Sequence, residues 1–233
     1  MNWLSRLFHP EVALSAEAAT RLDAWRRLPN PAGSELDASR FVVVDVETTG
    51  LNLARDRLIA IGAVAVNQGR IDLTDSFEII LQQPTASGKD NILIHGIGGT
   101  AQTGGVPPVE TLLRFLEFVG KDPLVAFHVT FDETMIKRAL KEFLHFDFKR
   151  PWLDLAYVMP GFLPELANRH RALDDWSGHF HIRNYARHSA LADALSTAQL
   201  FLAATKIARQ KNIPDFKGLQ DVEKAQRWIS WAS

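Results

Sequence analysis

The 233 residues contain no cysteine, which excludes structural disulfides and thiolate zinc sites. The eight histidines form no HExxH pattern, so a zincin-type metal site is excluded as well. There is almost no charge excess, with 26 Lys and Arg against 27 Asp and Glu. The chain therefore lacks the basic surplus of proteins that wrap long duplexes.

Long apolar runs are also absent, since none approaches the ~20 residues that a membrane helix requires. The first residues show no hydrophobic segment or cleavage site of a secretory signal. We therefore expect a cytoplasmic protein that does not contact membranes.

The most informative segment that is present is FVVVDVETTG, residues 41–50. Phe41 to Val44 form a short apolar run before a glycine-containing turn, which is typical of a buried strand. Side chains alternate along a strand, so Asp45 and Glu47 share one face. Two adjacent carboxylates need a cation or a proton to offset their repulsion, which indicates a hard divalent metal. The alternative is an ordinary strand end that has reached water.

Two later segments supply further ionisable groups. In residues 124–136, a short apolar strand precedes Asp132, which opens a helical pattern; the alternative role for this residue is a helix N-cap. In residues 187–201, His188 precedes a helix that carries Asp193. Five residues correspond to about 140° on a helix, so these two side chains converge only if His188 lies at the helix entry. Otherwise they are a surface histidine and a solvated aspartate.

Taken together, these segments resemble the DnaQ-like 3′–5′ exonucleases of the DEDD superfamily, in the subtype that uses histidine (DEDDh). The Asp-x-Glu-Thr-Thr-Gly motif matches residues 45–50, and the Phe-Asp pair matches residues 131–132. The Arg-His-x-Ala-Leu-x-Asp-Ala motif matches residues 187–194. The tyrosine subtype would need Tyr where Ser189 stands. The resemblance covers roughly residues 40–205.

The resemblance implies an α/β fold of the ribonuclease H-like type, with a mixed central sheet flanked by helices. It also implies two divalent metal ions, Mg²⁺ or Mn²⁺, which in such enzymes serve both ends of an in-line displacement at phosphorus. The implied metal ligands are Asp45, Glu47, Asp132 and Asp193. His188 would take the proton from the attacking water, because histidine ordinarily titrates near neutral pH. The implied substrate contacts are Thr48, Thr49, Gly50 and Leu51.

Two loop features complete the comparison with this family. His95-Gly96-Ile97 resembles a His-x-Ile segment that lies beside the substrate pocket, which makes His95 a further candidate. The acidic residues that usually follow are replaced by residues 98–100, Gly-Gly-Thr. Near the second motif the family usually has Asn four residues before the aspartate, and this chain has His128 there, preceded by Phe127.

The order of patterns predicts a mixed sheet within three regions. Residues 1–38 form a helical extension and linker, residues 39–205 the exonuclease domain, and residues 206–233 a tail. Strands are expected near residues 41–44, 58–66, 70–81, 124–127 and 152–155. Helices are expected over residues 14–28 and 108–119, from Asp132 onward, and after His188. Residues 83–106 read as a loop, and residues 161–187 as irregular with short helices.

The leading functional hypothesis is a metal-dependent 3′–5′ exonuclease that acts on single-stranded 3′ ends of DNA or RNA and releases nucleoside 5′-monophosphates. The alternatives are a catalytically silent nucleic-acid-binding module and a proofreading subunit of a DNA polymerase. A protein partner that docks through the termini is compatible with each. Trp228 and Trp231 favour docking, and we expect them to dock onto the domain itself rather than onto a partner.

Overall fold

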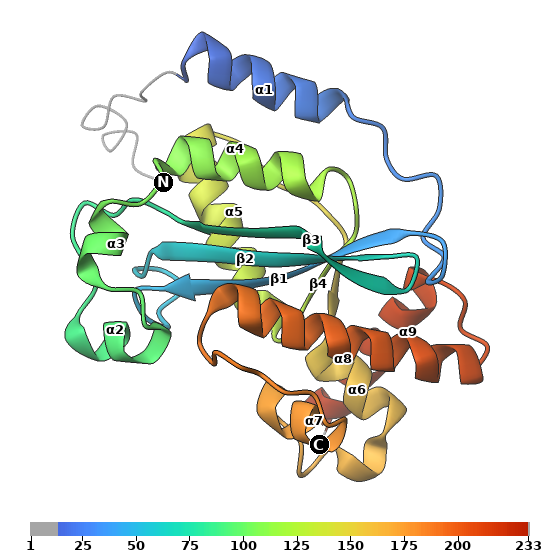
Figure 1. The fold of residues 1–233 in the computed structure, drawn as a ribbon. Coiled ribbons are helices and arrows are strands. Elements are labelled where there is room, and N and C mark those ends of the chain that lie inside the picture. The colour runs from blue at the N-terminus through green and yellow to red at the C-terminus, as the bar shows by residue number, and fades with distance from the viewer. Residues whose placement is uncertain (1–13, 233) are drawn as a thin grey trace.

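The computed structural model describes residues 14–232, and its centre is a mixed five-stranded sheet. The strand order is β3-β2-β1-β4-β5 (Figure 1). The strands are β1 (Arg40–Thr48), β2 (Leu58–Asn67), β3 (Arg70–Ile80), β4 (Leu124–Ala126) and β5 (Trp152–Asp154). β1, β2 and β3 pair antiparallel, whereas β4 and β5 run parallel to β1. This confirms the predicted α/β fold with a mixed central sheet.

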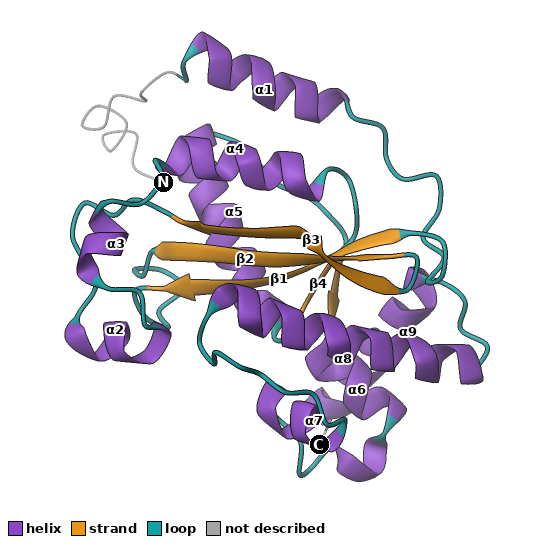
Figure 2. Cartoon of the chain, in the orientation of Figure 1, coloured by secondary structure: helices purple, strands orange, loops and turns teal. Residues whose placement is uncertain are grey.

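Helices cover both faces of the sheet (Figure 2). One face carries α1 (Ala16–Arg27), α4 (Pro108–Val119) and α5 (Val129–Leu144). The other face carries α6 (Leu155–Phe162), α7 (Leu173–His179), α8 (Ala190–Gln210) and α9 (Phe216–Ala232), with a 3₁₀ turn at Pro164–Leu166. Two short helices, α2 (Lys89–His95) and α3 (Gly99–Thr103), lie beside the carboxyl end of β1 (Figure 1).

Alternation along β1 divides the apolar side chains between two cores. Val42, Val44 and Val46 pack with α4 and α5, while Phe41 and Val43 pack with α8 and α9. Because successive side chains point to opposite faces, residues 45 and 47 continue the second series toward α8. Both carboxylates therefore lie on one face, as the alternation predicted, and the structure shows that α8 covers this face.

The β2–β3 hairpin forms where the sequence predicts it. Its two turn residues, Gln68 and Gly69, have φ values of 51° and 71°. Positive φ at both central positions is the geometry of a type I′ turn, whose twist matches that of the flanking strands. The predicted helices at 14–28 and 108–119 and the strand at 152–155 are also found, as α1, α4 and β5.

The prediction of a continuous loop over residues 83–106 is wrong, because α2 and α3 lie within it. Three glycines of this segment lie at the helix boundaries: Gly88 and Gly98 are N-caps, and Gly96 ends α2 with φ of 71°. The buried Gln102 ties the two helices together, since its Nε2 donates to the Ile97 carbonyl at 2.8 Å. The glycines therefore mark where the two helices begin and end, and they do not make the segment irregular.

Both predicted terminal regions contain helices that pack on the sheet layers. In the N-terminal region, Ala18, Leu22 and Trp25 of α1 are buried against the core shared with α4. At the other end, residues 206–210 continue α8, and α9 packs on α6 and β5. Trp228 and Trp231 nevertheless remain 78% and 91% exposed, so the expectation that they dock onto the domain is wrong. The three-region division itself stays a prediction.

None of the helices within residues 14–232 is both long enough and apolar enough to cross a membrane.

Candidate active site

Three carboxylates converge at the carboxyl end of β1. Asp45, Glu47 and Asp193 each offer an oxygen, and these oxygens all lie within 4.8 Å of one another. The first two come from β1, and Asp193 comes from the first turn of α8. Asp193 is 4% exposed, and the other two are half-buried. Strand alternation and the position of α8 therefore place all three on the same face of the sheet.

Gly62 on β2 lets α8 come this close. Gly62 pairs with Asp45 across the sheet, and a Cβ atom at Gly62 would lie 2.1 Å from the Ala190 carbonyl carbon. Only a residue without a side chain leaves room for the first turn of α8 against the strand. This close contact sets the distance between Asp193 on α8 and Asp45 on β1.

Asp132 reaches the site from the opposite face. It lies in the first turn of α5, is 5% exposed, and its Oδ1 accepts the Val46 N–H at 3.1 Å. Asp132 is not the N-cap, because α5 begins at Val129 and is capped by His128. The helical pattern identified the apolar stripe but missed the first three residues, since a single turn carries too few apolar positions to define a period. Asp132 thus approaches the β1 backbone between the two strand carboxylates.

Burial and mutual repulsion raise the affinity of this cluster for protons. Burial raises the pKa of Asp45 well above its ordinary range, and the charges of Asp132, Asp193 and Glu47 raise it further. Burial, followed by the charge of Asp193, raises the pKa of Glu47 from 4.5 to about 8. The pKa of Asp132 is raised by burial as well. Bringing these carboxylates together is electrostatically unfavourable unless a cation offsets their charge. Their oxygen atoms form a ligand set that suits Mg²⁺ or Mn²⁺.

A set of donors surrounds Asp193. Its Oδ2 accepts from Arg187 Nη1 at 2.8 Å and from the His188 backbone N–H at 3.1 Å, and its Oδ1 accepts from Asn184 Nδ2. Arg187 also pairs with Asp174 at 2.8 Å. The loop before α8 therefore folds around the Asp193 carboxylate and supplies a cationic partner for it.

His188 lies at the helix entry, immediately before the N-cap Ser189. Its backbone takes the left-handed conformation, with φ of 61°, and its side chain is exposed. The N–H bond to Asp193 holds the backbone of His188 next to that carboxylate. This is the geometry in which the two residues can converge despite their 140° helical separation.

The four predicted substrate-contacting residues of the first motif lie at the last residue of β1 and in the tight turn that follows. Thr48 Oγ1 donates to the Gly50 carbonyl at 2.6 Å, and Thr49 Oγ1 donates to Asp56 Oδ1 at 2.9 Å. A Cβ atom on Gly50 would lie 2.6 Å from Asp56 Oδ2, so a side chain there would displace the Asp56 carboxylate. Leu51 stands 85% exposed at its tip. The turn is closed by these side-chain hydrogen bonds and presents an apolar side chain to solvent.

His95 lies across a small cavity from the start of α8. The cavity has a volume of 210 Å³ and is lined by His95, Glu78, Ser189 and Ala190, among others. His95 is 5% exposed, and its Nε2 contacts Asn91 Oδ1 at 2.8 Å while its Nδ1 accepts the Ile97 N–H at 2.9 Å. Burial lowers its pKa. Both ring nitrogens are engaged locally, so His95 shapes the α2–α3 wall of this cavity.

His128, where the chain departs from the family pattern, also takes the left-handed conformation, with φ of 67°. Its N–H donates to Asp154 Oδ1 at 2.9 Å. Asp154 is buried at the end of β5, and its Oδ2 accepts from Arg227 Nη2 at 2.8 Å. Burial raises the pKa of Asp154. The backbone of residue 128, more than its side chain, therefore secures the start of α5.

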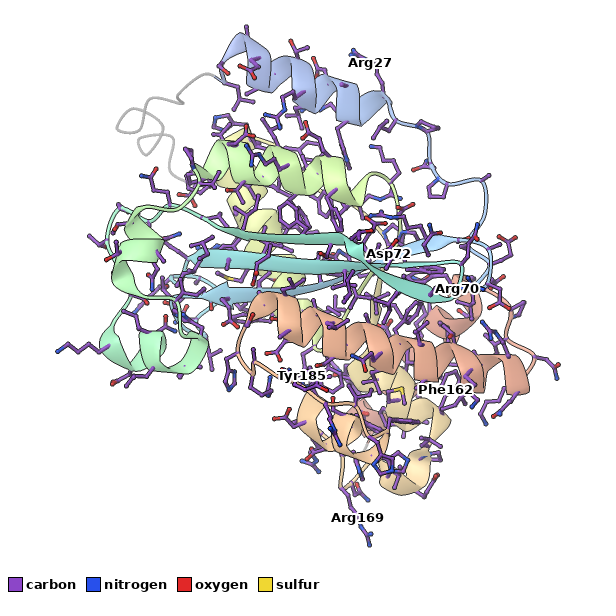
Figure 3. All side chains as sticks on the ribbon, viewed as in Figure 1. Arg27, Arg70, Asp72, Phe162, Arg169 and Tyr185 are labelled. Atoms are coloured by element: carbon purple, nitrogen blue, oxygen red, sulfur yellow. The ribbon has the colours of Figure 1, made fainter. Side chains whose placement is uncertain are left out.

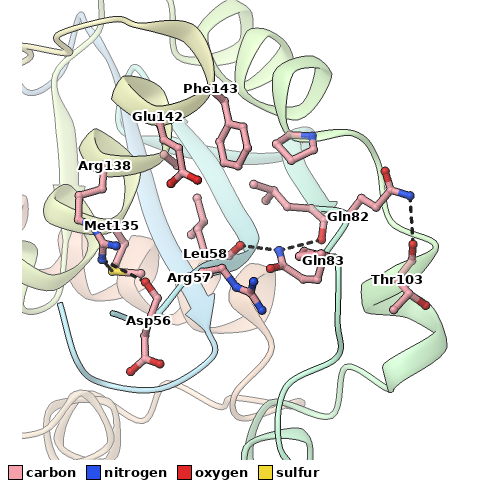
Figure 4. A pocket seen from close by; sticks show the side chains of 14 residues that line it. Asp56, Arg57, Leu58, Gln82, Gln83, Thr103, Met135, Arg138, Glu142 and Phe143 are labelled. Atoms are coloured by element: carbon pink, nitrogen blue, oxygen red, sulfur yellow. Dashed lines mark hydrogen bonds between the residues drawn. The ribbon is translucent and has the colours of Figure 1, made fainter. Parts of the chain in front are cut away.

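A larger cavity of 580 Å³ lies beyond the turn, between α5 and the start of β2 (Figure 4). Arg138 donates to the backbone carbonyls of Leu53 and Asp56 there, and Gln83 Nε2 donates to the Leu58 carbonyl at 2.9 Å. Its described lining includes none of the predicted site residues. The bonds from Arg138 hold the segment between β1 and β2 at the wall of this cavity.

Several contributors to the site were missed by sequence reasoning. Asn184 binds Asp193, Asp56 holds the turn, and Gly62 admits α8. Only Gly62 carried a signal, as an isolated glycine inside an apolar strand, which marks a close approach. Tyr185 also lies on the loop before α8, 86% exposed (Figure 3).

A family model described as an exonuclease, RNase T, matches residues 42–201. Among curated proteins, the PolC-type DNA polymerase III of Bacillus subtilis strain 168 is 32% identical over 185 residues, covering 79% of this chain and 13% of its own length. That of Thermotoga petrophila is 27% identical, covering 82% of this chain and 14% of its own length. The chain thus spans only about a seventh of these relatives.

Two solved structures share the fold. Escherichia coli exonuclease I in complex with a dT13 oligonucleotide has a TM-score of 0.64 and 17% identity, covering 74% of this chain and 42% of that chain. Cell-death related nuclease 4 has a TM-score of 0.64 and 13% identity, covering 73% of this chain and 65% of its own. At these identities the likeness shows the fold alone.

Proposed function

The chain belongs to the RNase T exonuclease family, which is DnaQ-like and of the ribonuclease H-like superfamily, and from this premise we propose that it is a metal-dependent 3′–5′ exonuclease. Its substrate is the single-stranded 3′ end of DNA or RNA, and its products are nucleoside 5′-monophosphates. The observation that carries the proposal is the convergence of Asp45, Glu47 and Asp193, with Asp132 behind them and His188 exposed beside them.

The proposed roles follow from what each side chain can reach. Asp45, Glu47 and Asp193 hold the cations, and Asp132 adds its charge from the opposite face. Two bound divalent ions would supply charge stabilisation to both the attacking and the leaving oxygen of an in-line displacement. The buried setting strengthens that effect, because electrostatic interactions are stronger where water is excluded.

His188 accepts the proton of the attacking water. Its imidazole is exposed, and its backbone N–H donates to Asp193, which keeps the residue close to the carboxylates. A general base must lie within hydrogen-bond reach of the proton that it removes, and the backbone anchor keeps His188 near the carboxylates that would hold the metal. The turn from Thr48 to Leu51 then places the terminal nucleotide through backbone groups and the exposed Leu51 side chain.

Three findings support polarity and substrate. The histidine stands in a motif that resembles that of the DEDDh subtype, and the fold is shared with an exonuclease I that was solved with a single-stranded oligonucleotide. The chain's net charge of −1 fits a short single-stranded end, which offers few phosphates to neutralise. We infer the 3′ end from the motif and the single strand from these charge and fold arguments.

The test follows a 5′-labelled single-stranded DNA oligonucleotide and an RNA of matching sequence, with Mg²⁺, with Mn²⁺ and with chelator. A metal-dependent ladder that shortens from the 3′ end is expected, and the ratio of the two rates identifies the preferred sugar. A 3′-labelled substrate provides the control, since its label is released in the first step. Cleavage from the 5′ end, or no cleavage with metal bound, contradicts the proposal.

A second candidate is a proofreading exonuclease that works beside a DNA polymerase. It is favoured by the similarity to PolC-type DNA polymerase III, which covers 79% of this chain at 32% identity in the Bacillus subtilis protein. Such an enzyme should prefer a mismatched 3′ terminus. A primer–template series with paired and mismatched ends, assayed for terminal excision, distinguishes it from an enzyme that accepts any free single strand.

A further inference from the structure

The last two turns of α9 carry a group of residues that the catalytic proposal does not use. Lys224, Arg227, Trp228 and Trp231 line an open groove with a volume of 430 Å³. Their spacing of three, four and seven residues places them on one helix face. We call these four residues the aromatic platform.

The platform's tryptophans are exposed to an unusual degree. Trp228 and Trp231 are 78% and 91% exposed, whereas Trp25, Trp152 and Trp176 are buried. Large aromatic side chains contribute more to stability when they are covered, and two neighbouring exposed ones mark an interaction surface. We therefore expect the groove to bind a ligand that packs against the flat faces of these rings.

The first two turns of α9 are packed on the domain. Leu219 is fully buried, and Gly161 of α6 lies so close that a Cβ atom there would be 2.8 Å from Val222 Cγ1. Gln220 Nε2 donates to the Trp152 carbonyl at 3.1 Å, and Glu223 Oε2 accepts the Asp154 N–H at 3.1 Å. The platform is thus held in place before any ligand binds, which lowers the entropy cost of binding.

A short chain of contacts links the platform to the candidate active site. Arg227 bonds Asp154, which ends β5, and the other oxygen of Asp154 accepts the N–H of His128. His128 caps α5, the helix that carries Asp132. Since β5 and β4 run parallel to β1, their carboxyl ends lie at the same edge of the sheet as Asp45. Through Arg227, the platform therefore contacts the end of the sheet where the reaction is proposed to occur.

The chemistry of the groove favours nucleic acid as the occupant. Among the described residues, the two charged ones that line it, Lys224 and Arg227, are both cations. Arg227 is paired with Asp154 and Glu223, so Lys224 is the cation better placed for phosphate; its side chain is 69% exposed and 4.0 Å from Asp221. Exposed aromatic rings beside cations are the arrangement on which single-stranded bases stack without regard to sequence.

We propose that the aromatic platform binds the nucleotides that lie 5′ to the terminal one, by stacking bases on Trp228 and Trp231. This inference rests on the proposed function, because it takes the substrate strand to leave the carboxylate site along this edge. It assigns α9 to substrate binding and makes affinity depend on the length of the strand.

The test measures binding in chelator, where no hydrolysis occurs, by fluorescence anisotropy of labelled dT oligonucleotides of about 3 and about 16 nucleotides, the longer being the upper end of single-strand site sizes. The wild-type protein should bind the longer strand more tightly. In the Trp228→Ala/Trp231→Ala double variant, this length advantage should fall by at least about tenfold. The Trp228→Phe/Trp231→Phe variant keeps the rings and should retain most of it.

Two controls isolate stacking from other effects. Leu73→Ala removes an exposed apolar side chain from β3, 62% exposed, and should leave the length advantage intact. Lys224→Ala should lower the slope of log K against log salt by about 0.7, the value for one phosphate contact on a single strand. Circular dichroism of each variant verifies folding.

An unchanged length advantage in the double alanine variant would overturn the proposal. A second result would also overturn it: the wild-type protein sediments as a dimer, the double variant sediments as a monomer, and both bind oligonucleotides equally well. The groove would then join two copies of the chain. The labelled-ladder assay decides the proposed function separately. If the protein produces the ladder but the double alanine variant keeps the length advantage in binding, only the platform proposal fails. If the double variant loses that advantage but no ladder forms with the wild-type protein, only the catalytic proposal fails.

Discussion

At the scale of single residues, Asp193 is the carboxylate on which the candidate site depends most. It is buried, it joins the two β1 carboxylates, and it collects bonds from Arg187, Asn184 and the backbone of His188. In the proposed function this group has two roles, because it would offer an oxygen to a cation and it holds the loop that carries the proposed base.

We expect Asp193→Asn to lower metal affinity and turnover by at least about 100-fold, since the loss of a ligand should exceed the effect of an outer partner. The amide is isosteric, so circular dichroism should show an intact fold. Asp147→Asn, at a side chain that is 73% exposed, is the matched control and should behave like wild type. Digestion at the wild-type rate by the Asp193 variant would refute its assignment.

Metal affinity should depend on pH through Glu47. Its pKa in the metal-free protein is about 8, against 4.5 ordinarily, so between these values the folded state holds a proton that the unfolded chain has lost. The metal-free protein therefore loses stability as pH rises from 4.5 to 8, and a cation that binds in this range must displace the proton.

Affinity for Mn²⁺ should accordingly rise by up to about tenfold per pH unit toward pH 8 and then level off. Titration calorimetry at several pH values measures it. Repeating one titration in buffers of different ionisation enthalpy counts the protons released. A constant affinity across this range, with no proton release, would contradict the prediction.

Arg187 occupies an oxygen of Asp193 that a bound cation would also use. Its Nη1 lies 2.8 Å from Asp193 Oδ2, so it offsets part of the repulsion in the metal-free cluster. In Arg187→Gln, the melting temperature of the metal-free protein should fall, and the rise in melting temperature on adding Mg²⁺ should increase. Thermal melts with chelator and with Mg²⁺ test both. Arg183→Gln, on the same loop and exposed, should change neither.

At the scale of elements, the packing of α8 on β2 sets the geometry of the site. The helix has room only because residue 62 is glycine, and its first turn carries both the N-cap Ser189 and Asp193. A shift between these two elements would move one carboxylate against the others without touching any proposed ligand.

Gly62→Ala should therefore destabilise the protein by about 1–3 kcal/mol through overpacking, and lower turnover by displacing α8. Chemical denaturation and the ladder assay measure the two effects. Gly178→Ala in α7, where a Cβ atom meets open space, is the control and should be neutral or stabilising by up to about 1 kcal/mol. Equal behaviour of the two variants would show that α8 is not held at this distance.

At the scale of the whole molecule, the sheet separates two apolar cores, and helices near both ends of the described chain complete them. α1 contributes Leu22 and Trp25 to one core, and α9 contributes Phe216 and Leu219 to the other. The proposed site lies at the sheet edge where the two layers meet, so it draws Asp132 from one layer and Asp193 from the other.

If α1 belongs to the cooperative unit, Leu22→Ala should lower the free energy of unfolding by about 2–5 kcal/mol, because Leu22 is 2% exposed. Leu28→Ala, at 44% exposure just after the helix, should change it by no more than about 0.5 kcal/mol. Urea denaturation followed by circular dichroism compares them. A small effect at Leu22 would mean that α1 detaches before the domain unfolds.

The sequence by itself determined the elements whose signals are local. The apolar run before Asp45, the hairpin at Gln68 and Gly69, and the motifs around Asp132 and Asp193 were all readable, because alternation, turn chemistry and motif spacing act over a few residues. They were enough to predict the mixed sheet, the family and the identity of the candidate ligands. The same reasoning took residues 83–106 for a loop, because composition does not reveal glycines placed at helix ends.

Only the tertiary structure decided how these parts meet. Asp132 approaches through the Val46 N–H from the opposite face, Gly62 sets the height of α8, and Asn184 and Arg187 close around Asp193. It also left Trp228 and Trp231 exposed where docking onto the domain was expected. Such outcomes depend on packing between segments far apart in the chain, and the alternation of apolar and polar residues within one segment carries no information about its distant partner.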